Sequence, residues 1–127
     1  MLPSARVLLA TRPVNMRLSI DSLARVVIEE LHADPRAAGA VYVFINGKRD
    51  RAKLLWREAT GWCLLYKRLD THLFPARDVA NGVDSLAIEP RALASLLDGV
   101  ARVRKERAGK IAVESRAKAM AVVVDGV

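Results

Sequence analysis

The middle of this 127-residue chain holds three short runs of β-forming residues that are separated by two turns. The first run, AVYVFI, leads into Asn46-Gly47, the dipeptide most typical of a tight hairpin. The second run, RAKLLWRE, alternates apolar and charged side chains over most of its length, and Gly61 separates it from the third run, WCLLYKRLD. Residues 40–70 are therefore predicted to form a three-stranded antiparallel meander, which strongly limits how the rest of the chain can fold.

The alternation along these strands assigns their charged side chains to a face. Lys53 and Arg57 alternate with the apolar residues of the second strand, and Lys67 lies near the end of the third. We expect these three cations to share the face that points away from the core. The aromatic residues alternate in phase with apolar neighbours, so we expect them to pack into the core. They are Trp56, Trp62 and Tyr66.

The segments that flank the meander complete an α+β pattern. RVLLATRPV reads as a short strand, and apolar residues at helical spacing predict a helix over residues 19–31, with Ser19 as its N-cap. Residues 71–85 are loop-like, and a second helix is predicted from Pro90 to near Gly99. The expected fold class is α+β, with a β-α-β-β-β-α order, an antiparallel β-meander packed against two helices, and a variable C-terminal tail.

Chain length and hydropathy limit the class of protein. Hydrophobic residues make up 52% of the chain, which is enough for a core. The longest apolar runs fall far short of the roughly 20 residues that a membrane-spanning helix needs, and the N-terminus does not resemble a secretory signal. We therefore expect an intracellular, cytoplasmic protein without a membrane partner. Residues 1–101 are expected to form one α+β domain, and residues 102–127 a basic C-terminal segment and tail.

Positive charge is concentrated in two blocks of the sequence. The net charge is +7 and the pI about 10.2, which favours a polyanionic partner such as DNA, RNA or an acidic protein surface. Residues 48–70 and 102–127 each hold seven basic and three acidic side chains, whereas residues 71–101 hold two basic and four acidic ones. The first block is the predicted hairpin. It is either a surface for DNA phosphates or a solvated basic face.

Residues suited to catalysis or metal binding are few and dispersed. Cys63 is the only cysteine, which excludes an internal disulfide and a cysteine-based zinc site. It sits between Trp62 and Leu64, where a cysteine usually packs as a small hydrophobe, so a nucleophilic pair with His32 or His72 is not favoured. The aspartates are scattered, and the seven glycines form no phosphate-binding loop. We expect no enzyme activity, no catalytic residue, no metal and no cofactor.

Three blocks of the sequence resemble a known family. They are VNMRLSIDSLARVV, then VYVFINGKRDRAKLLWREATGWCLLYKRLD, and last the pair LFPA and LASLLDGV. In this order and spacing, over about residues 5 to 100, they are similar to the small accessory protein encoded by the second open reading frame of the insertion-sequence-sixty-six family of bacterial transposable elements. The chain departs from the family pattern at Leu18-Ser19, where the family has Lys-Gly, and at Phe74, where it has tryptophan.

The resemblance implies an accessory role in DNA transposition beside a separate catalytic transposase, with no catalytic residue to carry over. From the clustering of charge, we predict that the basic hairpin contacts DNA or a DNA–transposase complex. The residues predicted to contact DNA are Arg17, Lys48, Arg49, Arg51, Lys53, Arg57, Lys67 and Arg68. The alternative is a protein-interaction module without direct DNA contact. It would dock on the transposase or form a homo-oligomer, through a strand edge or the apolar stretch AMAVVV.

Overall fold

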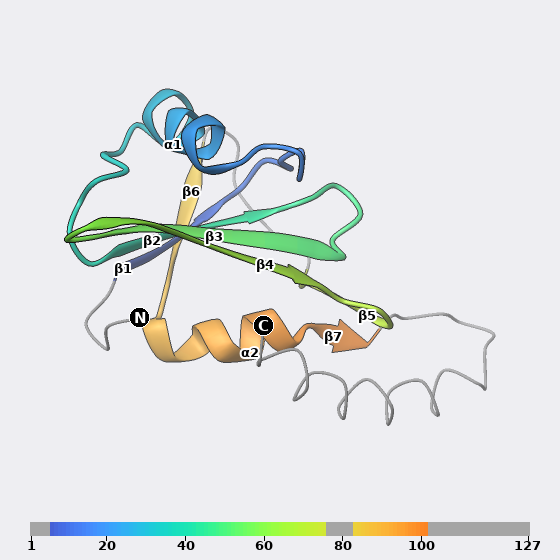
Figure 1. Ribbon diagram of the computed structural model, residues 1–127. Helices are drawn as coiled ribbons and strands as arrows, with labels where there is room; N and C mark the ends of the chain where they lie inside the picture. Colours follow the sequence, from blue (N-terminus) through green and yellow to red (C-terminus); the bar gives the residue numbers. More distant parts are fainter. Residues whose placement is uncertain (1–5, 76–82, 102–127) are drawn as a thin grey trace, which may run out of the picture.

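The computed structural model describes residues 6–75 and 83–101, which form a five-stranded sheet between two helices (Figure 1). The strands of the sheet are β1 (Arg6–Ala10), β2 (Ala40–Ile45), β3 (Arg51–Glu58), β4 (Gly61–Arg68) and β6 (Ser85–Ile88). The helices are α1 (Ile20–Glu29), the 3-10 turn η1 (Pro90–Ala92) and α2 (Leu93–Asp98). Two short strands, β5 (His72–Leu73) and β7 (Val100–Ala101), pair with each other. The predicted α+β fold class is confirmed.

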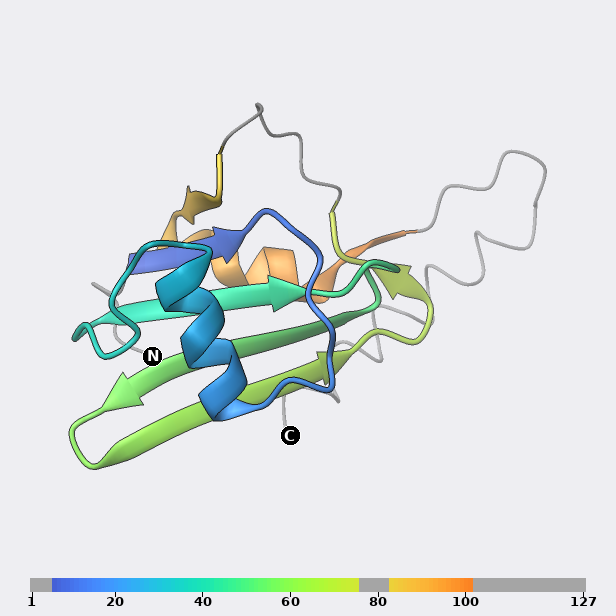
Figure 2. The same ribbon diagram turned by 90° about the horizontal axis from the view of Figure 1, so that it is seen from above.

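The antiparallel meander predicted for residues 40–70 is present as β2, β3 and β4. In the strand order β4-β3-β2-β1-β6, β2 lies at the centre of the sheet. It pairs with β3 from Val41 opposite Trp56 to Ile45 opposite Ala52. All six residues of β2 are buried, because α1 covers one face of the sheet and α2 the other, as Figures 1 and 2 show. This explains why AVYVFI is uniformly apolar instead of alternating.

Two pairings of the five-stranded sheet lie outside the predicted meander. β1 pairs parallel with β2, since the chain between them crosses back through α1, and the sheet is therefore mixed. β6 pairs antiparallel with β1, from Val7 opposite Ile88 to Ala10 opposite Ser85. No strand is predicted at residues 85–88, because SLAI is too short to show a period of its own.

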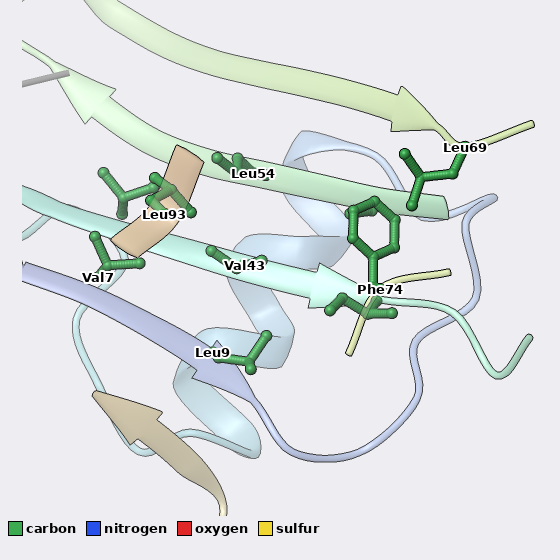
Figure 3. Packing of buried hydrophobic residues seen from close by; sticks show 10 residues of the cluster. Val7, Leu9, Val43, Leu54, Leu69, Phe74 and Leu93 are labelled. Carbon is green, nitrogen blue, oxygen red and sulfur yellow. The ribbon is translucent and has the colours of Figure 1, made fainter. Parts of the chain in front are cut away.

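The sheet separates two hydrophobic clusters. Leu23 and Val27 of α1 pack with Tyr42, Phe44 and Leu55 on one side. The cluster on the α2 side is shown in Figure 3, where the labelled residues are Val7, Leu9, Val43, Leu54, Leu69, Phe74 and Leu93. Because successive residues of a strand point to opposite faces, β2 contributes to both clusters. Burial of each large apolar side chain contributes about 1.5–3 kcal/mol to stability.

The prediction that Lys53, Arg57 and Lys67 share one solvated face is wrong. The β3–β4 register places Lys53 opposite Tyr66, and Ala52 opposite Lys67. Since directly opposed side chains lie on the same face, Lys67 is on the α2 side whereas Lys53 and Arg57 are on the α1 side. Only 7% of Lys53 and 3% of Lys67 is exposed. The prediction failed because it assumed that one face of the meander is open, and both faces are covered.

The described elements all fall within the predicted domain of residues 1–101. In the part of the chain that the structure describes, no helix has the length and apolar character needed to cross a membrane. Residues 102–127, with the basic C-terminal segment and the AMAVVV stretch, lie outside the described residues. The domain boundary near residue 101 therefore stays a prediction.

Candidate nucleic-acid interface

The turn between β2 and β3 is shaped by the side chain of Asn46. Its Oδ1 accepts hydrogen bonds from the backbone N–H groups of Asp50 and Arg51, both at 3.0 Å, and its Nδ2 donates to the Asp50 carboxylate at 2.6 Å. The left-handed residue of the turn is Arg49, with φ 61°, and not Gly47. The Asn-Gly signal thus marks the place of the turn correctly, while the asparagine side chain sets its conformation.

The turn is also tethered to the segment that follows β4. The carbonyl oxygen of Arg49 accepts a hydrogen bond from the N–H of Phe74 at 2.7 Å, and Arg49 Nη1 donates to the Phe74 carbonyl at 3.2 Å. The carbonyl of Asp50 accepts from the N–H of Leu69 at 2.8 Å. Phe74 is fully buried in the α2-side cluster. These bonds anchor one end of the turn to the core, while Lys48 stays exposed.

Replacing Asn46 by alanine is expected to lower the free energy of unfolding by about 2 kcal/mol, because three hydrogen bonds of its side chain are lost. Urea denaturation followed by tryptophan fluorescence measures the change. The control is Lys48→Ala in the same turn, which removes an exposed side chain and should change stability by less than about 0.5 kcal/mol. Equal stability of the two variants would show that the asparagine side chain does not hold the turn.

Lys53 fastens the loop between β1 and α1 onto the hairpin. Its Nζ donates to the carbonyl oxygens of Met16 at 2.7 Å and Leu18 at 2.6 Å, and it lies 5.0 Å from the centre of the Tyr66 ring. A buried ammonium needs such partners, because an uncompensated charge away from water is strongly destabilising. Lys53 therefore holds residues 13–18 against the β3–β4 face and does not present its charge to solvent.

The fastened loop and the turn border an open pocket of about 560 Å³, which we call the basic pocket. Three cations from three separate segments line it: Arg17 of the loop, Lys48 of the turn and Arg51 at the start of β3. The other lining residues are Pro13, Val14, Asn15, Met16, Asn46, Gly47 and Tyr66. No carboxylate is among these described lining residues, so the pocket is expected to carry a positive potential that favours an anion.

Two arginines are directly opposed beside the basic pocket. Arg51 and Arg68 are partners across β3 and β4. Like charges in such positions destabilise a sheet, so they indicate a place where a bound polyanion would relieve repulsion. Arg68 Nε lies 3.5 Å from the Asp70 carboxylate, but an exposed pair of this kind is worth little in water. The end of the hairpin thus keeps an excess of positive charge.

Two of the predicted cations lie away from the basic pocket. Arg57 is near the far end of β3, about 20 Å from Arg51 at the ordinary rise of a strand. Its guanidinium lies 5.5 Å from the centre of the Trp62 ring. Lys67 is buried on the α2 side, with its Nζ 3.9 Å from the Asp98 carboxylate. DNA contact by Arg57 and Lys67 stays a prediction, and their placement gives it no support.

Comparison with known proteins identifies the family. The family model described as "IS66 Orf2 like protein" matches residues 5–107. The chain belongs to the IS66 Orf2-like family. Two similar curated proteins come from Sinorhizobium fredii (strain NBRC 101917 / NGR234). "Uncharacterized protein y4hO" is 37% identical over 103 residues, 79% of this chain and 87% of the relative. "Uncharacterized protein y4jC" is 29% identical over 102 residues, 80% and 85% of the two chains. No solved structure matches.

The resemblance predicted from three sequence blocks is thereby confirmed, and it places this IS66 Orf2-like protein among proteins associated with transposition. Tyr66 lines its basic pocket, so the prediction that this residue packs into the core is wrong. Trp56 and Trp62 do pack against the two clusters, whereas Tyr66 is 45% exposed. The sequence does contain one indication that Tyr66 is exposed. It stands next to Lys67 and Arg68, after the apolar run of the strand has ended.

Cys63, the residue considered for nucleophilic catalysis, is not among the residues that line the basic pocket of this IS66 Orf2-like protein. Partial burial raises the pKa of its thiol, and a hydrogen bond to the Glu58 carboxylate raises it further. A thiol with a raised pKa is a poor nucleophile near neutral pH. Trp56 Nε1 also donates to Glu58, at 3.1 Å, and these two bonds lower the pKa of Glu58. Among the described residues, no three His, Cys, Asp or Glu side chains gather as a metal site requires.

Proposed function

We propose that this protein is a non-catalytic accessory protein of DNA transposition that contacts DNA through the basic pocket. The convergence of Arg17, Lys48 and Arg51 on one hollow, with no acidic neighbour among its described lining, carries the proposal. Membership of the IS66 Orf2-like family supplies the link to transposition.

The exposed cations of the pocket suit the DNA backbone. Arginine offers a planar fork of donors to phosphate oxygens, and lysine offers a compact point charge. Arg17 and Lys48 are exposed, so they can reach phosphates without rearrangement of the fold. Contacts of this kind release counterions, which makes affinity fall steeply with salt. They carry no sequence information, so little base preference is expected.

A protein-interaction module is the second candidate function, and β4 favours it. This strand is eight residues long, lies at one edge of the sheet and pairs with β3 on its other side. An edge of this length can accept a strand from another chain. The transposase or a second copy of this protein would then be the partner.

Fluorescence anisotropy of the full chain with a labelled random-sequence duplex, and with duplexes that carry the ends of the element, tests the proposed function. With three phosphate contacts, the logarithm of the association constant K is expected to fall with the logarithm of the salt concentration at a slope of about −3 or steeper. The two kinds of duplex are expected to bind with similar affinity. If neither duplex bound at low salt, the proposal would be overturned and the protein-interaction module would take its place.

A further inference from the structure

Tyr66 is exposed at the one end of the hairpin where cations gather. Its side chain is 45% exposed, and it lines the basic pocket. The Nζ of Lys53 lies 5.0 Å from the centre of its ring, in an arrangement that attracts a cation to an aromatic face. This contact holds the ring from one side, so the exposed part of the ring is available to a ligand in the pocket.

The basic pocket is larger than a lone phosphate group requires. Its volume of about 560 Å³ falls within the range of roughly 300–1,000 Å³ that is typical of pockets for organic ligands. The lining joins the three cations to apolar and aromatic groups, among them Val14, Met16 and Tyr66. A ligand that matches both parts has an anionic group and a flat, largely apolar group next to it.

The amide oxygens of the two asparagines in the lining are already engaged within the protein. Asn46 uses both its Oδ1 and its Nδ2 to hold the turn. Asn15 Oδ1 accepts a hydrogen bond from the backbone N–H of Arg17 at 2.8 Å. Stacking on the ring of Tyr66 is an interaction that the pocket offers to a nucleobase without any free amide oxygen. Stacking tolerates every base, because each base has a flat face.

We propose that the basic pocket binds one unpaired nucleotide of DNA. The three cations of the pocket contact its phosphate and the neighbouring phosphates of the strand, and its base stacks on the ring of Tyr66. This inference rests on the proposed function and narrows its ligand from DNA in general to DNA with unpaired bases. Inside a duplex a base is stacked between its neighbours and cannot reach the ring without leaving the stack. The protein should therefore prefer single strands, gaps and frayed ends, which strand breakage produces.

Anisotropy with three labelled probes tests this inference: a mixed-sequence single strand, the same strand in a duplex, and the duplex with a short gap. At equal salt, the wild-type protein is expected to bind the single strand and the gapped duplex about 10-fold more tightly than the intact duplex. Tyr66→Ala should abolish this preference, because it weakens single-strand binding more than duplex binding, and Tyr66→Phe should keep it, because the ring is retained.

A second measurement guards against a folding defect in the alanine variant. The single strand carries 2-aminopurine, a base whose fluorescence is quenched when it stacks on an aromatic ring. Quenching is expected with the wild-type protein and with Tyr66→Phe. It should be absent with Tyr66→Leu, which keeps an apolar side chain over Lys53 but removes the aromatic face.

The outcomes separate this inference from the proposed function. Equal wild-type affinity for single strand and duplex would overturn the inference and leave the proposed function standing. A preference for single strands that survives in Tyr66→Ala would also overturn it, because the unpaired strand would then bind elsewhere. Tighter binding to RNA than to DNA of the same sequence would overturn the assignment to DNA. No binding to any probe would overturn both proposals.

Discussion

Reversing the charge of Arg17 and Lys48 together, with glutamate at both positions, is expected to weaken DNA binding on the order of 100-fold near physiological salt. This loss corresponds to about 2.7 kcal/mol of binding free energy, which is the size expected when one charge-assisted contact is lost at each position. Both side chains are exposed, so the fold should be unaffected. The slope of log K against log salt should also become shallower by about 2, since two phosphate contacts are lost. Anisotropy over a salt series measures both quantities.

The matched control is Arg25→Glu combined with Arg91→Glu. It changes the net charge by the same amount, at exposed positions on α1 and η1 that do not line the basic pocket. Charges more than about 10 Å from a bound phosphate are largely screened, so only a small loss of affinity is expected. If the control weakened binding as much as the pocket variant, overall charge alone would explain binding and the pocket would have no special role.

Lys53→Met is expected to lower the free energy of unfolding by about 3 kcal/mol. Two hydrogen bonds from a charged donor are lost, each worth about 1.5–3 kcal/mol, and part of this is offset because no ammonium has to be buried. Methionine keeps most of the length and volume of the side chain, so little packing is lost. DNA affinity should fall as well, because the loop that carries Arg17 is no longer fastened. Urea denaturation and anisotropy of the same variant measure the two effects.

Lys48→Met separates the two effects of Lys53→Met. It removes an exposed cation of the basic pocket, so affinity should fall while stability changes by less than about 0.5 kcal/mol. Replacing a lysine that holds the loop must therefore lower both the free energy of unfolding and DNA affinity. Replacing a lysine that only contacts phosphate lowers DNA affinity alone. Wild-type stability in Lys53→Met would show that this lysine does not hold the loop.

The parts of the fold that the sequence predicted well depend on local patterns. Turn residues and apolar runs located β2, β3 and β4, because a strand and its hairpin neighbour are adjacent in the chain. The helical spacing of apolar residues likewise located α1, whose buried residues are Leu23 and Val27. Each of these features follows from side chains that lie within a few residues of one another.

The features that the sequence could not predict depend on partners far along the chain. Lys53 alternates with apolar residues and so reads as solvent-exposed, but carbonyl groups 37 and 35 residues away cover it. Residues 85–88 become β6 only because the edge of β1 is open to them. No local pattern records which distant loop or strand covers a given face.

The basic pocket has one part that could be predicted from the sequence and one part that could not. Lys48 and Arg51 could be named as candidates because charge clusters in the hairpin sequence, and Arg17 because it lies in VNMRLSIDSLARVV, the first block that resembles the family. Their convergence could not be predicted, since it requires the loop after β1 to cross the hairpin and be held there by Lys53. Tyr66 lines the pocket for the same reason, because the loop crosses the hairpin beside it and Lys53, which holds the loop, lies 5.0 Å from the centre of its ring.

The most direct test of DNA binding at the basic pocket is NMR mapping of amide chemical shifts as DNA is added to the full chain. Binding there predicts that the largest shifts occur at residues 13–17, at residues 46–51 and at Tyr66, which line or border the pocket. Amides of β6, at the other edge of the sheet, and of α2, on its other face, should change little. Shifts confined to α2, to β6 or to residues 102–127 would contradict the central claim.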